Sequence, residues 1–251
     1  MVKFAANLTF LFKEYPPHER IEKAALAGFE HVEILNPYEL PATEIQRALA
    51  RHQVGLTLIN CPPPNYTGGA AGFAAQPEQQ DRFRRDFKRT MRYAQLLKPQ
   101  HVHIMAGAAE GHAAHAVFIE NLKWAAAEAP GQSLTIEPIN RDDMPGYFLC
   151  NYNQARAILA EVAAPNLGLQ FDVYHAFKIT GDALQCWDEM RDLVTHIQIG
   201  GIPDRREPEA GKFDFPAFFA ALDAQGYSGF VSAEYNPRKT TEAGLGWLAR
   251  G

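Results

Sequence analysis

Short apolar runs with strand character recur along the chain, and each is followed by a segment with helical periodicity. The runs begin roughly 24 to 46 residues apart, which suits repeated β–α units. Strands rich in Val, Ile and Phe that alternate with helices predict a parallel sheet covered by helices. Eight repeats in 251 residues therefore predict an α/β protein with a single (β/α)8 TIM barrel. The predicted strands are Phe4–Phe10, His31–Leu35, Gly55–Cys61, His101–Gly107, Ser133–Ile139, Leu167–His175, Val194–Gly200 and Gly229–Tyr235.

Start and stop signals mark the helices between these strands. Pro77 opens a helix that Pro99 stops, and Asn151 or Asn153 caps another that ends before Pro165. A doubly wound sheet is the alternative, but no Gly-x-Gly-x-x-Gly motif follows the first strand. One domain over residues 1–251 is the simplest organisation, because no linker or internal repeat divides the chain.

The connections between elements are lopsided in length. Segments that lead from a helix to a strand are short, whereas Pro62–Ala75, Asn140–Leu149 and Gly201–Lys212, which leave strands, are long. In a barrel the long segments share the C-terminal face, where active sites lie. Pro62–Ala75 is also rich in Pro and Gly, so it is a candidate for a moving lid, with an ordinary surface loop as the alternative.

Composition and charge narrow the class of protein. Hydrophobic residues make up 47% of the chain, which excludes a disordered chain. The net charge of −5 disfavours generic binding of nucleic acid or of an anionic membrane. The three Cys are widely spaced, no secretory signal opens the chain, and no apolar run reaches the ~18 residues of a membrane span. We therefore expect a cytoplasmic protein.

Four of the later strands end in polar residues that are costly to bury: Glu137, Asp172, Gln198 and Glu234. A carboxylate near a barrel interior loses hydration, and three on nearby strands also repel one another. A bound divalent cation would resolve both problems, and an all-oxygen ligand set favours Mg²⁺ or Mn²⁺ over Zn²⁺. The alternative for each residue is a hydrogen bond to a neighbouring strand at the end of the barrel.

Several longer stretches, which together run from the first strand to the C-terminus, carry a family resemblance. They are FAANLTFLF from Phe4, AGFEHVEIL with PY at Pro37, VHIMAG from Val102, FDVYHAFKITGD from Phe171, HIQIGGIPDRREP from His196, and EYNPR with TEAGLGW from Glu234. In these stretches the chain resembles the hydroxypyruvate isomerase family, within the xylose-isomerase-like barrel superfamily of sugar isomerases and epimerases. The GGIPDRREP segment and the C-terminal EYNPR…GLGW are the most specific.

The resemblance implies roles for individual residues. Glu137 and Glu234 match two catalytic glutamates that also bind the metal, and Asp172 and Gln198 match the remaining ligands. Many sugar epimerases of the superfamily have His where this chain has Gln198, so the glutamine favours the hydroxypyruvate isomerase branch.

Four further residues are candidates for contact with the substrate. His175 and Arg205 match substrate-contacting positions of the family, and an Arg is suited to grip the carboxylate of a 2-oxo acid. The alternative for Arg205 is a surface pair with Glu207 or Asp204. His103 is a candidate for lining the pocket. Glu33 would contact the substrate or orient a histidine at the end of the barrel.

The chemistry that the resemblance implies is an aldose–ketose type isomerisation, an intramolecular oxidation and reduction. Hydroxypyruvate and tartronate semialdehyde differ by the movement of a proton between adjacent carbons through an enediolate. A metal would stabilise the developing charge, while one carboxylate removes the carbon proton and another group returns it.

Other functions stay open at this stage. Within the superfamily they are a 2-oxotetronate isomerase, a metal-dependent ketose 3-epimerase and an inosose dehydratase. Two other classes of function are a metal-dependent endonuclease and a non-catalytic sugar-binding module. Abasic-site nucleases share this barrel type, but they need more His ligands and a basic face. We expect a small-molecule 2-oxo acid as partner, with neither nucleic acid nor membrane, and we leave homo-oligomer formation open.

Overall fold

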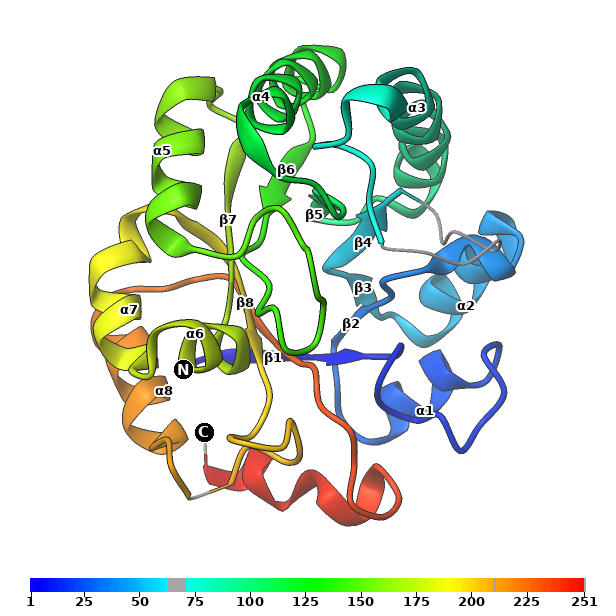
Figure 1. Cartoon of the computed structure of the whole chain (residues 1–251). Helices are drawn as coiled ribbons and strands as arrows, with labels where there is room; N and C mark the ends of the chain where they lie inside the picture. Colours follow the sequence, from blue (N-terminus) through cyan, green and yellow to red (C-terminus); the bar gives the residue numbers. More distant parts are fainter. Residues whose placement is uncertain (63–70, 210, 251) are drawn as a thin grey trace.

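The computed structural model describes residues 1–62, 71–209 and 211–250 (Figure 1). Its strands form one sheet in the order β3-β2-β1-β9-β8-β7-β6-β5-β4, and every neighbouring pair is parallel. The predicted TIM barrel is confirmed. The strands are β1 (Lys3–Asn7), β2 (His31–Glu33), β3 (Gly55–Leu56), β4 (Leu58–Cys61), β5 (His101–Ile104), β6 (Ser133–Ile136), β7 (Leu167–Asp172), β8 (Val194–Ile199) and β9 (Phe230–Ala233).

The ninth strand arises because the predicted strand Gly55–Cys61 is divided into β3 and β4. Thr57 lies between the two pieces. Its backbone N–H donates to the carbonyl of Val32 at 2.8 Å, and its own carbonyl accepts from the N–H of His101 at 2.8 Å. Since Thr57 is bonded on both sides, β3 and β4 act as one strand that joins β2 to β5 and closes the barrel.

Helices surround the strands in a ring, with α6 lying nearer the strand ends (Figure 1). Within the described parts of the chain, no helix combines the length and apolar character needed to cross a membrane. The α-helices are α1 (Arg20–Leu26), α2 (Ala42–His52), α3 (Gln80–Leu97), α4 (Gly111–Glu128), α5 (Tyr152–Val162), α6 (Val173–Thr180), α7 (Ala183–Met190) and α8 (Phe215–Ala224). The 3-10 helices are η1 (Pro37–Glu39), η2 (Pro77–Gln79), η3 (Arg191–Leu193) and η4 (Glu242–Arg250).

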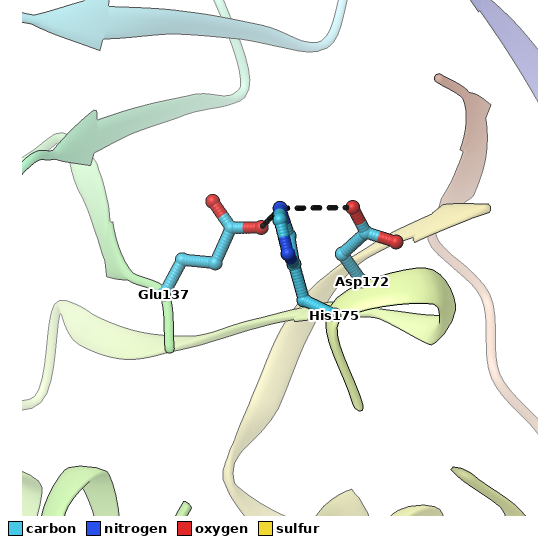
Figure 2. A group of neighbouring side chains, drawn as sticks. All are labelled: Glu137, Asp172 and His175. Carbon is cyan, nitrogen blue, oxygen red and sulfur yellow. Dashed lines mark ion pairs between the residues drawn. The ribbon is translucent and has the colours of Figure 1, made fainter. Parts of the chain in front are cut away.

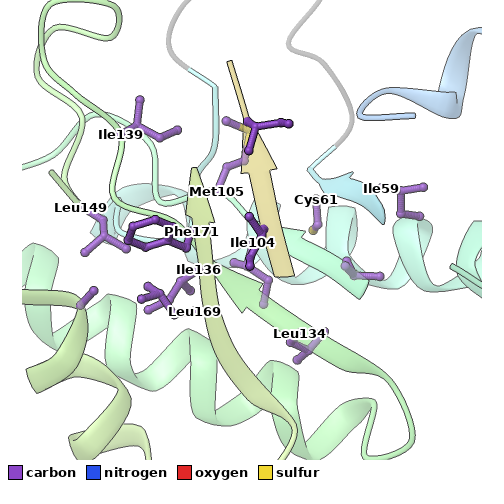
Figure 3. Close-up of a cluster of buried hydrophobic side chains, with 14 of the residues drawn as sticks. Ile59, Cys61, Ile104, Met105, Leu134, Ile136, Ile139, Leu149, Leu169 and Phe171 are labelled. Carbon is purple, nitrogen blue, oxygen red and sulfur yellow. The ribbon is translucent and has the colours of Figure 1, made fainter. Parts of the chain in front are cut away.

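The outward-facing side chains of the strands form the hydrophobic core with the helices. Leu134, Ile136, Leu169 and Phe171 belong to this layer and are fully buried, and Figure 3 shows them with their neighbours. Because side chains alternate along a strand, the residues between them face the barrel interior.

The barrel interior of this chain is mostly polar, unlike the usual TIM-barrel interior of branched apolar residues. Glu33 on β2 contacts His196 on β8, and two strands separate β2 from β8 in the sheet, so this contact crosses the interior. The buried inward-facing polar residues are Asn7, Glu33, Asn60, His103, Thr135, Gln170, Asp172, His196, Gln198 and Ser232.

The predicted strand Leu167–His175 is too long, and its placement of His175 in a strand is wrong. β7 ends at Asp172 and α6 begins at Val173. The side chain of Asp172 accepts a hydrogen bond from the backbone N–H of Tyr174 at 2.8 Å, which caps the first turn of the helix. His175 therefore projects from the first turn of α6.

Most of the predicted lid, Pro62–Ala75, lies outside the described residues, so the lid stays a prediction. Its described end packs against the segment that follows β5. Gly72 forms an antiparallel bridge with Ala106, and the N–H of Ala75 donates to the carbonyl of Ala106 at 2.8 Å. Phe73 is buried in the same place.

The structure also decides which asparagine caps α5. The side chain of Asn151 accepts from the N–H of Gln154 at 3.1 Å, whereas Asn153 lies inside the helix. We expect Asn151→Ala to lower the free energy of unfolding by about 1 kcal/mol, because it leaves a helix N–H without its acceptor. Urea denaturation measures this change. Asn153→Ala is the matched control, and an equal loss in both variants would contradict the assignment.

Candidate active site

The four acidic and amide side chains predicted as ligands come from consecutive strands of the barrel. Glu137 directly follows β6, Asp172 ends β7, Gln198 lies near the end of β8, and Glu234 directly follows β9. Each of them is at most 5% exposed. Because parallel strands end at the same side of the barrel, all four reach its C-terminal mouth.

Glu137, Asp172 and His175 lie close together in this mouth. One ligand atom from each lies within 4.8 Å of the other two. Figure 2 shows the imidazole of His175 between the two carboxyl groups, with Nε2 3.6 Å from Asp172 Oδ2 and 4.0 Å from Glu137 Oε1. The structure thus places His175, predicted to contact the substrate, beside two of the predicted metal ligands, Glu137 and Asp172.

Asn140 determines which nitrogen of His175 carries the proton. The side-chain oxygen of Asn140 accepts from the N–H of Asp143 at 3.0 Å, so its Nδ2 faces His175 Nδ1, at 2.7 Å. Nδ1 is therefore an acceptor. Burial lowers the pKa of His175 well below its ordinary value, and nearby Arg205 lowers it further. His175 is a neutral imidazole whose Nε2–H points toward the carboxylates, which makes it a hydrogen-bond donor rather than a metal ligand.

Arg205 lies among the predicted ligands. Its Nη2 is 2.8 Å from Asp172 Oδ2 and 2.6 Å from Glu234 Oε1. The alternative of a surface pair with Glu207 or Asp204 is wrong, because Arg205 pairs with the buried Asp172 and Glu234 instead, and Glu207 is paired with Arg238 at 3.2 Å. Since Asp172 and Glu234 share one nitrogen of Arg205, their carboxylates lie close enough to face a common ligand.

A chain of hydrogen bonds supports the site from inside the barrel. Gln170 Nε2 donates to Glu137 Oε2 at 3.0 Å and to Gln198 Oε1 at 2.7 Å, while its own oxygen accepts from Thr135. Gln198 Nε2 in turn donates to Glu33 Oε1. The chain therefore connects one predicted catalytic glutamate with the predicted amide ligand.

Glu33 and His103, both predicted to contact the substrate, lie in this buried layer. Besides Gln198, Glu33 has Asn7 Nδ2 at 2.6 Å and His196 Nε2 at 2.7 Å. Both of its oxygens already have protein partners, which favours a positioning role. His103 Nδ1 lies 3.7 Å from Glu137 Oε2, and its Nε2 has no hydrogen-bond partner within the described part of the chain.

Burial dominates the protonation of the acids. It raises the pKa of Glu137 well above its ordinary value, with further increases from Asp172 and Glu234. It raises the pKa of Glu234 to about 8 and that of Asp172 to about 6, although Arg205 opposes both shifts. One guanidinium therefore does not balance three carboxylates, and the mouth favours either protons or an additional cation.

Sequence reasoning missed two residues that hold the site in place. Gln170 lies two positions before Asp172, so the alternation of a strand places both on the inner face and signals its role. Asn140 lies in the long segment after β6 and gives no comparable signal, because its contact with His175 depends on the path of that loop.

Comparisons with known proteins agree with the barrel fold. Residues 21–251 match the family model for the xylose isomerase-like TIM barrel. The chain is 40% identical to a 2-oxo-tetronate isomerase of Cupriavidus necator, and the match covers 99% of this chain and 98% of that protein. It is 35% identical to the hydroxypyruvate isomerase of Escherichia coli K12, again over 99% and 98% of the two chains.

Solved structures with the same fold carry more varied descriptions. A Brucella melitensis protein described as an AP endonuclease of family 2 has a TM-score of 0.95 and 40% identity, covering 99% of this chain and 98% of that chain. A D-psicose 3-epimerase of Clostridium cellulolyticum H10 has a TM-score of 0.79 and 17% identity, over 97% and 89% of the two chains. At that identity the epimerase shows the shared fold alone.

The raised pKa of Glu234 predicts how stability depends on pH when divalent ions are removed. The folded protein binds this proton more tightly than the unfolded chain, because the pKa rises from 4.5 to about 8 on folding. The free energy of unfolding should therefore fall as the pH rises from about 4.5 to 8, by at most about 1.4 kcal/mol per pH unit for this group. Urea denaturation in EDTA measures the slope, which should be smaller in Glu234→Gln. Parallel pH profiles for the two proteins would contradict the assignment.

Proposed function

Because the chain belongs to the xylose isomerase-like TIM barrel family, we propose that it is an isomerase of small 2-oxo acids, with hydroxypyruvate and tartronate semialdehyde as the interconverted pair. The observation that carries this proposal is the pair of buried glutamates, Glu137 and Glu234, at the mouth with Asp172 and Arg205. Acids with raised pKa values are suited to accept and release a proton near neutral pH.

A divalent cation fits this donor set. Arg205 pairs with only two of the three buried carboxylates, Asp172 and Glu234, and Glu234 Oε2 has no partner within the described part of the chain. Glu137, Asp172, Gln198 and Glu234 would hold the ion, and their oxygen atoms favour Mg²⁺ or Mn²⁺. When bound, it would polarise the substrate oxygens as a Lewis acid.

The two glutamates would divide the proton transfer. One carboxylate takes the proton from C3 of hydroxypyruvate; the C–H electrons form a C2–C3 double bond, and the carbonyl electrons move onto O2. The carboxylic acid of the pair then gives a proton to C2, where the electrons of the C2–C3 double bond form the new C–H bond, while a lone pair of O3 forms the aldehyde C=O. The proton of O3 ends on O2, so atoms and charge balance, and the glutamates exchange roles in the reverse direction.

Two other groups would orient the substrate. Arg205 offers a cation to the substrate carboxylate. Its Nη2 is already committed to Asp172 and Glu234, so its Nη1 is the end that a substrate reaches. The Nε2–H of His175 points toward the mouth and is suited to donate to a substrate oxygen on which charge develops.

The four-carbon acid 2-oxotetronate is the second candidate substrate. It is favoured by the 40% identity to the 2-oxo-tetronate isomerase of Cupriavidus necator. The reacting carbons and the carboxylate are the same in both acids, and the larger one needs room for one more hydroxymethylene group.

An endonuclease is a third candidate, because a Brucella melitensis protein with the same fold is described as an AP endonuclease of family 2. A nuclease needs a basic face for the phosphate backbone, whereas this chain has 24 Lys and Arg against 29 Asp and Glu. The mouth also gathers buried acids around one arginine, which suits a small polar substrate better than DNA.

The central prediction concerns the two glutamates and the cation. We expect Glu137→Gln and Glu234→Gln each to lower kcat on hydroxypyruvate at least about 100-fold, since an amide cannot accept the carbon proton. Chelation should abolish turnover, and Mg²⁺ or Mn²⁺ should restore it. A coupled assay of tartronate semialdehyde formation measures both effects. Glu120→Gln, at an exposed carboxylate, is the matched control. Full activity of either site variant would refute the assignment.

Substrate preference gives a separate prediction. We expect kcat/KM to be higher for hydroxypyruvate and 2-oxotetronate than for free ketoses by at least about tenfold, because only the acids offer a carboxylate to Arg205. Parallel assays on the three substrate classes rank them. Faster turnover of uncharged ketoses would remove the role proposed for Arg205, and salt-sensitive binding of DNA in a gel-shift titration would favour the nuclease.

A further inference from the structure

Two aromatic rings lie against the guanidinium of Arg205. The Cζ atom of Arg205 is 5.0 Å from the ring centroid of Phe10, which follows β1, and 5.0 Å from that of Tyr174, in the first turn of α6. Phe10 is half-buried and Tyr174 is buried. We call these two residues the aromatic pair. An arginine over a ring face is attracted by the ring's π electrons, and stacking also restricts the orientation of the guanidinium plane.

The backbone near Arg205 is built for this placement. Arg205 has a φ of +52°, in the left-handed region, and its carbonyl accepts from the N–H of Asn236 at 2.8 Å. A Cβ at Gly200 would lie 2.9 Å from Arg205 Cγ and 2.9 Å from the carbonyl oxygen of Glu234, which is closer than real side chains pack. The first glycine of the GGIPDRREP segment therefore leaves the space that the Arg205 side chain needs to reach the mouth.

The hydrogen bonds of Arg205 leave one end of the guanidinium available. Nη2 is used by Asp172 and Glu234, and Nε donates to the carbonyl of Glu234 at 3.3 Å. Nη1 has no hydrogen-bond partner in residues 1–62, 71–209 and 211–250, and the Arg205 side chain is 14% exposed, which leaves this end of the guanidinium for a ligand. Nη1 carries two N–H donors, and one of them is enough to donate to an oxygen of the substrate carboxylate.

We propose that the aromatic pair orients Arg205 so that Nη1 receives the substrate carboxylate, which makes Phe10 and Tyr174 positioning residues that determine the preference for 2-oxo acids over neutral ketoses. The inference rests on the proposed isomerase function and extends it to residues outside the acid cluster. Without the rings, Arg205 keeps its charge and its ion pairs, but the orientation of Nη1 is no longer restricted. The loss should therefore fall on acid binding rather than on proton transfer.

The test compares hydroxypyruvate with dihydroxyacetone, which has the same carbon chain without the carboxylate. We expect Phe10→Leu and Tyr174→Leu each to lower kcat/KM for hydroxypyruvate about tenfold, mainly through KM, and to change dihydroxyacetone turnover by less than about twofold. Tyr174→Phe keeps the ring and loses only the hydroxyl bonded to Asp143, so it should restore most of the acid preference. Tyr15→Leu, which removes a ring under Lys23, is the matched control outside the mouth.

A double-variant cycle shows whether the rings act through Arg205. In an Arg205→Leu background, Phe10→Leu should cause no further loss of acid preference. Equal losses on both substrates, or an undiminished effect in that background, would overturn the proposal and leave the rings a packing role. Thermal denaturation identifies any variant that fails to fold.

A wild type that turns over neither compound would contradict the proposed function instead. Calorimetric binding of pyruvate, a 2-oxo acid that lacks the 3-hydroxyl, then still tests the aromatic pair. About tenfold weaker binding by Phe10→Leu supports the proposal. Equal binding by both proteins, or none by the wild type, overturns it.

Discussion

Desolvation of three carboxylates at one end of a barrel is the constraint on which the site depends. Glu137, Asp172 and Glu234 are held there by the ends of β6, β7 and β9, and burial raises the pKa of each. Arg205 offsets part of this cost through Asp172 and Glu234, and the excess negative charge remains. The features that make the mouth unfavourable for ionised acids also suit it to proton transfer and to a bound cation.

The barrel was predictable because its cause is local and repeated. Each apolar run of strand length followed by a helical pattern gives one β–α unit, and eight units close the sheet. Two details were not predictable from the same signals. The break at Thr57 comes from bonding to both neighbouring strands, and the turn into α6 comes from Asp172 serving as both strand end and helix cap. The pattern of apolar residues alone predicts neither the break at Thr57 nor the start of α6 directly after Asp172.

The acids of the site were found for a similar reason, since a charged residue at the end of an apolar strand needs an explanation. Their partners were harder to find. The contact of Asn140 with His175 joins a loop to helix α6, and that of Arg205 with Asp172 joins a loop to strand β7, each across at least 33 residues of sequence. Such contacts depend on the path that the long connections take over the mouth, and the composition of a loop does not encode that path. The resemblance to known isomerases named Arg205 but gave no reason for its position.

Because the barrel interior is polar, the strands stabilise the fold with one face and carry the residues of the site on the other. The strands are anchored by their outer faces, where Leu134, Ile136, Leu169 and Phe171 meet the helices. Their inner faces instead carry a hydrogen-bonded polar layer, in which Gln170 contacts Glu137 and Gln198. The outer face of the barrel sheet thus stabilises the fold, while the inner face carries the polar side chains of the site. This division is consistent with a shared fold in neighbours that keep only 17% of the sequence.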